Sequence, residues 1–185
     1  MPINGELFQE KLAVHSAPTL MNMKVGSLFC IKKQDIPNYI ECLDYFNSRF
    51  SSSELNICIL KDRPKDSLVY VYRYDQLEKL LSNNNISRFL DSLSYSLNSV
   101  EEALDSLKDN LNKESFPHEI GIFLGYPLHD VKAFMNNDMP SKCIGCWKVY
   151  GNTKNALKTF KRYNCCTKRI KDEISAGKRL FDLIS

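Results

Sequence analysis

The chain has 185 residues, of which 43% are hydrophobic and 25% charged, and its formal net charge is +3. A chain of this size and composition is expected to form one globular domain, residues 1–185, whose core requires neither disulfide nor metal. It shows no signal-peptide pattern and no run of about 18 apolar residues. We therefore expect a soluble cytoplasmic protein with reduced cysteines and no membrane span. A pI of about 8.4 lies below the range typical of strong nucleic-acid binders.

Hydrophobic periodicity and turn residues predict alternating helices and strands in the first 111 residues. Pro18 is expected to end the first helix, because proline disfavours a helical conformation in the residue before it. Ser99 and Glu102 have the spacing of a capping box and predict a helix start. In chain order, the predicted elements are a helix at 5–15, a strand at 26–31, a helix at 34–50, a hairpin of strands 55–60 and 67–73, and helices at 74–81, 86–97 and 100–111.

The remaining chain is predicted to end in a long amphipathic helix that runs from Asn152 or Thr153 towards Leu183. Its apolar side chains recur every three or four residues from Ala156 to Ile174, and lysines and arginines lie between them. The elements before it are a strand at 120–124, a turn at 125–127, a helix at 128–135 and a strand at 144–150. Strands and helices mix without strict alternation, so we predict an α+β fold with a mixed sheet of about four or five strands covered by helices.

Two segments carry most of the unusual residues, Phe116–Val131 and Gly145–Gly151. The first contains two histidine–acid pairs, and the second contains the only tryptophan. Together with Ala17–Lys24 and Leu68–Arg73, these segments resemble domain-of-unknown-function family 3793, whose members occur mainly in anaerobic bacteria. The resemblance extends over nearly the whole chain and implies no activity, cofactor or partner. Ser16 replaces the cysteine, and Asn22 the glycine, that the family pattern commonly has.

The histidine–acid pairs are the best candidates for chemistry. His118 can act as a general base oriented by Glu119 or Asp130, with Ser16 or a water as nucleophile, which would make the chain a small hydrolase or transferase. Together with His129 they also have the ligand types of a zinc or iron site. Alternatively, these residues brace a turn and a helix start and have no chemical role. The sequence does not decide whether the chain is an enzyme, and the cofactor stays unknown.

The leading interpretation is a cytoplasmic accessory or ligand-binding protein with its site around residues 116–131. The side chains expected to contribute to binding are Ser16, Thr19, Tyr126, His129 and Trp147. The partner is an unknown small ligand or a protein. Neither of the common glycine-rich phosphate-binding loops is present.

Two further features leave alternatives open. Cys143 and Cys146 suit structural zinc, redox chemistry or ordinary thiols, and the adjacent Cys165 and Cys166 would chelate one metal poorly. Residues 142–179 contain eleven lysines and arginines against two acids. This basic stretch can bind nucleic acid in a salt-dependent manner, but a solvated helix face is the expected role, so nucleic acid is an unlikely partner.

Overall fold

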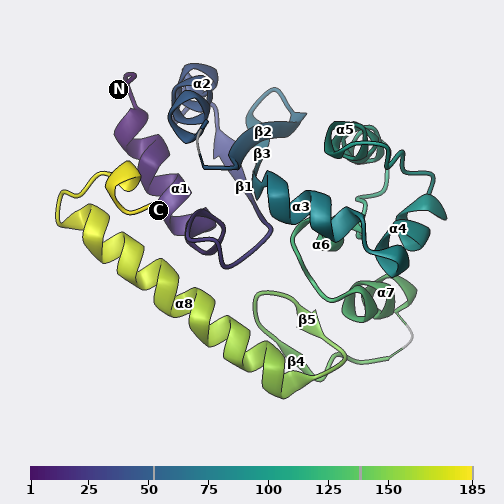
Figure 1. The fold of residues 1–185 in the computed structure, drawn as a ribbon. Coiled ribbons are helices and arrows are strands. Elements are labelled where there is room, and N and C mark those ends of the chain that lie inside the picture. The colour runs from purple at the N-terminus through teal and green to yellow at the C-terminus, as the bar shows by residue number, and fades with distance from the viewer. Residues whose placement is uncertain (52, 138, 185) are drawn as a thin grey trace. The chain divides into compact units, whose positions relative to one another are not determined.

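Helices and antiparallel strands follow one another irregularly in the computed structural model, which describes residues 1–51, 53–137 and 139–184 (Figure 1). The helices are α1 (Gly5–Leu20), α2 (Tyr39–Phe50), α3 (Tyr74–Leu81), α4 (Asn84–Asp91), α5 (Val100–Leu111), α6 (Ile120–Phe123), α7 (Leu128–Asn136), α8 (Thr153–Ser175) and the 3-10 turn η1 (Leu180–Asp182). The strands are β1 (Gly26–Lys32), β2 (Leu55–Asp62), β3 (Asp66–Arg73), β4 (Cys143–Ile144) and β5 (Lys148–Val149). Within the described residues, no helix is long and apolar enough to cross a membrane.

The α+β class is confirmed, and the described strands are divided between two sheets, ordered β1-β3-β2 and β4-β5. The chain forms two compact units, residues 1–77 with 166–185 and residues 78–165. The expectation that 1–185 is a single domain stays a prediction.

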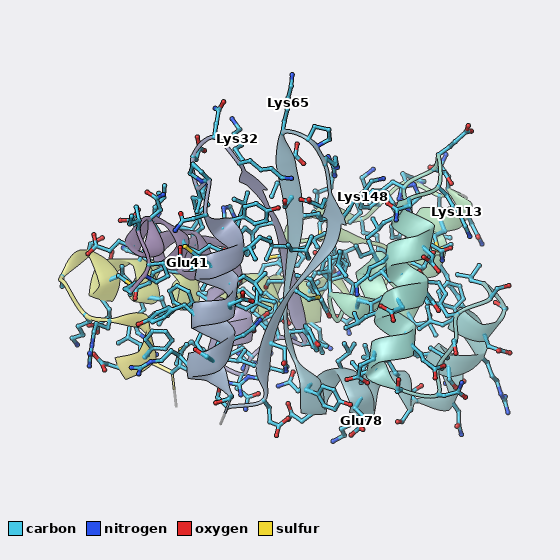
Figure 2. All side chains as sticks on the ribbon, turned by 90° about the horizontal axis from the view of Figure 1, so that it is seen from above. Lys32, Glu41, Lys65, Glu78, Lys113 and Lys148 are labelled. Atoms are coloured by element: carbon cyan, nitrogen blue, oxygen red, sulfur yellow. The ribbon has the colours of Figure 1, made fainter. Side chains whose placement is uncertain are left out.

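The first unit is built on the antiparallel sheet β1-β3-β2. The predicted hairpin is confirmed: β2 pairs with β3, and Lys65 projects from the turn between them (Figure 2). The residues alternate in side-chain direction, so Val69 and Val71 point to one face of β3. That face packs against α1, α2 and the last turns of α8 in one apolar core. Stacked rings of Phe8 and Phe46, 5.2 Å apart, lie in this core.

The first helix does not end before Pro18, because α1 continues to Leu20. Its last turn is buried in the core, and tertiary contacts supply hydrogen bonds that the sequence pattern does not reveal. The Arg73 guanidinium donates to the carbonyl oxygens of Thr19 and Leu20, at 3.3 and 3.1 Å, and so caps the helix. The chain then leaves the helix through Asn22 at a φ of 57°, a left-handed conformation that asparagine tolerates and glycine adopts freely.

The second unit begins with short helices. The Ser99 side chain accepts a hydrogen bond from the Glu102 amide, which confirms the predicted start of α5. The helix predicted at 86–97 starts earlier and is shorter, since α4 ends at Asp91. The Asn83 side chain caps α4 by accepting hydrogen bonds from the backbone amides of Asn85 and Ile86.

The strand predicted at 120–124 is wrong, because Ile120–Phe123 form the helix α6. The amide of Ile122 donates to the Glu119 carbonyl and that of Leu124 to the Ile120 carbonyl, which is helical hydrogen bonding. All four residues of α6 are buried. A short run that is apolar on every side has no periodicity that separates a helix from a buried strand. The turn at 125–127 and the following helix, α7, are present, with Gly125 at a φ of 73°.

The strand predicted at 144–150 is instead a tight hairpin. Cys143 pairs with Val149 and Ile144 with Lys148, so the chain reverses between them. A Cβ atom on Gly145 would lie 2.2 Å from the Phe160 ring, so this turn has room only for glycine. The long helix α8 follows and ends at Ser175, earlier than predicted, before Gly177 at a φ of 87°.

Candidate functional site

The second unit contains a pocket of about 410 Å³, which we name the aromatic pocket. The end of the loop before α6, the helices α6 and α7 and the hairpin β4-β5 supply its walls. The apolar and aromatic residues that line it are Phe116, Ile120, Gly121, Leu124, Tyr126, Val131, Phe134 and Trp147. The other three lining residues have basic or acidic side chains: His118, Asp130 and Lys148.

The Trp147 indole is held between two other rings. It stacks on Tyr126 with ring centres 5.1 Å apart and meets Phe160 edge to face at 4.6 Å. The Tyr126 hydroxyl donates to the Cys146 carbonyl oxygen at 3.0 Å, which ties the turn after α6 to the hairpin. Burial raises the pKa of Tyr126 to about 12, so the phenol stays protonated at neutral pH. This wall of the pocket is therefore packed in place.

Asp130 is the hydrogen-bonding centre of this region. Its side chain is 3% exposed. Oδ2 accepts from the Trp147 indole N–H at 2.8 Å. Oδ1 accepts from the backbone amides of Tyr150 and Gly151 at 2.8 and 2.9 Å. A carboxylate bound in this way joins α7 to the chain before α8 and sets the orientation of the indole.

His129 lines a second pocket of about 330 Å³. Trp147 and Asp130 line both this pocket and the aromatic pocket. Its Nε2 is 3.0 Å from Asp130 Oδ1, and its side chain is 58% exposed. The imidazole lies directly over Gly151, where a Cβ atom would be 1.7 Å from Nε2. His118 and His129 thus line different pockets.

Glu119 makes its side-chain hydrogen bonds with residues other than His118. Its Oε1 accepts from the Tyr95 hydroxyl at 2.9 Å and from the Asn110 amide at 3.5 Å, and the carboxylate is buried. Burial raises the pKa of Tyr95, so the phenol remains the donor of this bond. Glu119 therefore joins α6 to α5 and the preceding loop.

The His118 ring packs against phenylalanines. It meets Phe134 edge to face at 4.9 Å and Phe116 at 6.2 Å. The expected orientation of His118 by Glu119 or Asp130 stays a prediction. In the structure, both carboxylates accept hydrogen bonds from other residues.

Ser16 and Thr19 belong to the first unit, in the last turns of α1. Both are fully buried, and the Thr19 and Ser27 hydroxyls share a hydrogen bond of 2.8 Å. The Ser16 Oγ has no hydrogen-bond partner among the described residues. A serine nucleophile needs an adjacent base, and no described base is hydrogen-bonded to the Ser16 Oγ.

The cysteines are distributed over both units. All seven cysteines are free thiols; Cys166 is buried in the first unit, whereas Cys146 and Cys165 are exposed. In the part of the chain that the structure describes, no three histidine, cysteine or acidic side chains come close enough to hold a metal ion.

The basic residues of α8 are exposed as the sequence pattern predicts. The apolar stripe from Ala156 to Ile174 is buried or half-buried, whereas Leu157 is exposed. Ala156 and Phe160 pack with Val149 in the second unit. The exposed basic residues are Lys154, Lys158, Lys161, Arg162, Lys168, Arg169 and Lys171.

Sequence reasoning missed Phe116 and Phe134 as pocket walls. One available signal was the spacing of four between Asp130 and Phe134, which places both on one side of α7. The prediction that Tyr126 and Trp147 contribute to a site agrees with their place in the pocket lining, although binding itself is untested.

A family model described as "Protein of unknown function (DUF3793)" matches residues 12–184 of this chain. Searches of curated proteins and of solved structures found no match.

Proposed function

This chain belongs to the DUF3793 family, and we propose that it is a cytoplasmic accessory protein that binds the apolar body of a small molecule in the aromatic pocket. One observation carries the proposal: a concave site of about 410 Å³ lined mainly by apolar and aromatic side chains. Small-molecule sites in proteins are typically concave, apolar and roughly 300–1,000 Å³ in volume.

The walls of the pocket support binding because they are held in place before any ligand arrives. Asp130 fixes the indole N–H of Trp147, and Tyr126 stacks on the same ring. A preorganised site loses less conformational entropy when a ligand binds. Phe116, half exposed at the pocket, leaves apolar surface that a ligand can cover.

Trp147 makes the test direct, because it is the only tryptophan and lines the pocket. Phenylnaphthylamine is an uncharged aromatic probe whose absorption overlaps tryptophan emission, so a probe bound in the pocket quenches Trp147 while its own emission rises. We expect saturable binding, and about tenfold weaker binding to Phe134→Ala. The factor corresponds to about 1.4 kcal/mol, the loss of roughly 55 Å² of apolar contact.

Phe89→Ala is the matched control. Phe89 is a half-buried ring of the same unit that, like Phe134, carries a lysine about 5 Å from its centre. It is not part of the pocket lining. If Phe134→Ala lowers the thermal stability, the half-exposed Phe116→Ala provides the second measurement. Absent binding, or equal weakening by Phe89→Ala and the pocket variants, would reject the proposal.

A second candidate function is a hydrolase in which His129, and not the expected His118, acts as the general base. A single contact favours it, the 3.0 Å between His129 Nε2 and Asp130 Oδ1. A carboxylate that orients an imidazole is the arrangement of a general base. Hydrolysis of small aryl esters and phosphomonoesters by wild type, His129→Gln and His118→Gln tests this candidate. A rate that falls only in His129→Gln supports it, and equal rates in all three proteins reject it.

A further inference from the structure

Lys148 gives the aromatic pocket a positive charge that no acid among residues 1–51, 53–137 and 139–184 pairs with. It is an exposed residue of β5, labelled in Figure 2. Its Nζ lies 5.0 Å from the centre of the Phe134 ring, which lines the pocket. Among the described residues, the ion pairs involve other side chains and leave this ammonium group without a carboxylate partner.

Asp130 is the acid that lines the pocket, and its oxygens are already engaged. Oδ2 accepts from the Trp147 indole, and Oδ1 accepts from two backbone amides and lies beside His129. A buried carboxylate with this many donors has little capacity left for a cationic ligand. The charge available to a ligand is therefore that of Lys148.

His118 adds a hydrogen-bond donor to the pocket lining, beside the same phenylalanine ring as Lys148. Its ring packs edge to face on Phe134 with centres 4.9 Å apart. The ammonium and the imidazole are thus both within about 5 Å of one ring centre, and no more than about 10 Å from each other. An imidazole carries at least one N–H in either of its charge states.

We infer that the ligand of the aromatic pocket is a ring compound with an apolar or aromatic body and one anionic group, bound by Lys148 and the His118 N–H. The inference rests on the proposed function. The body of the ligand would lie against Trp147 and Phe116, and the anion at Phe134. Since Lys148 is exposed, the attraction is partly screened by water, and we expect a contribution of about fivefold in affinity.

Two probes with the same rings separate the two proposals. Phenylnaphthylamine is uncharged, and anilinonaphthalene sulfonate has the same ring system with an added sulfonate. We expect Lys148→Gln to weaken sulfonate binding about fivefold and binding of the uncharged probe less than twofold. The effect of the substitution should shrink at high salt, because ions screen exposed charges.

Lys132→Gln is the control, since the Lys132 ammonium lies 4.9 Å from the Phe89 ring in the same unit but outside the pocket lining. It should bind both probes as wild type does. If Lys148→Gln weakens both probes equally, or neither, while the uncharged probe still binds wild type, the inference of an anionic ligand is overturned and the proposed function stands. If the uncharged probe does not bind wild type, the proposed function itself fails.

Discussion

Replacing Asp130 by asparagine keeps the size of the side chain but removes its charge and one acceptor. In the wild type, one oxygen faces the Trp147 indole N–H and the other faces the amides of Tyr150 and Gly151. An asparagine can keep its oxygen on the two amides only by turning its NH₂ group towards the indole, so that two donors face each other. The opposite orientation is worse, because the NH₂ group then opposes two backbone amides.

The cost follows from hydrogen bonds lost in a buried place. One charge-assisted bond disappears, worth about 1.5–3 kcal/mol, and a donor is left without an acceptor, which adds about 1 kcal/mol. The 3% exposure of Asp130 leaves little room for water to compensate. We expect Asp130→Asn to lower the free energy of unfolding by about 2–4 kcal/mol.

The assay is urea unfolding followed by far-UV circular dichroism, which does not require the tryptophan. Trp147→Phe removes the opposed N–H, so Asp130→Asn should cost about 1–2 kcal/mol less in that background than in wild type. Asp109→Asn, at an exposed position of α5, is the control and should change stability by no more than about 0.5 kcal/mol. A loss below about 0.5 kcal/mol for Asp130→Asn, or an equal loss in both backgrounds, would refute this account.

Three other predictions concern the first unit. Ser16→Ala should raise the free energy of unfolding by about 1 kcal/mol in urea, because it removes a buried hydroxyl that has no described partner; a loss of stability would contradict this. Arg73→Lys should cost about 2–4 kcal/mol, since three carbonyl oxygens accept from the guanidinium, whereas Arg63→Lys at an exposed ion pair should stay within about 0.5 kcal/mol. Hydrogen bonds from Ser67 and then Lys33 lower the pKa of Asp62 from 3.8 to about 2. Its carboxylate therefore stabilises the fold above about pH 3.8 and ceases to do so as the pH falls towards 2. The melting temperatures of wild type and Asp62→Asn should accordingly differ at pH 6 and converge near pH 2, and a gap that does not change with pH would contradict the assignment.

Local signals predicted the elements whose residues carry a clear period or cap. The β2-β3 hairpin has β-rich strands on either side of a polar turn, and α5 has Ser99 at its start. The exposed basic face of α8 follows from the spacing of its apolar residues. These patterns depend on neighbours within a few positions, so they are visible in the chain itself.

Other features required contacts between residues far apart in sequence. Pro18 stays inside α1, where the carbonyl oxygens of Thr19 and Leu20 accept from Arg73, more than 50 positions away. Residues 120–123 are helical, although a short apolar run fits a strand equally well. In the first case the local rule for proline predicted the wrong answer, and in the second no local rule separates a helix from a strand.

The sequence by itself determined the family and the α+β class, because these rest on motif content and periodicity. It also predicted a site at Phe116–Val131 with Trp147, and residues of both line the aromatic pocket. Only the tertiary structure decided the partner of each polar side chain. It bound Glu119 to Tyr95 and Asp130 to Trp147, and it placed Phe134 with Lys148 at the pocket. The physical reason is that a buried carboxylate takes the donors that folding brings within about 3 Å, and those donors come from other elements of the chain.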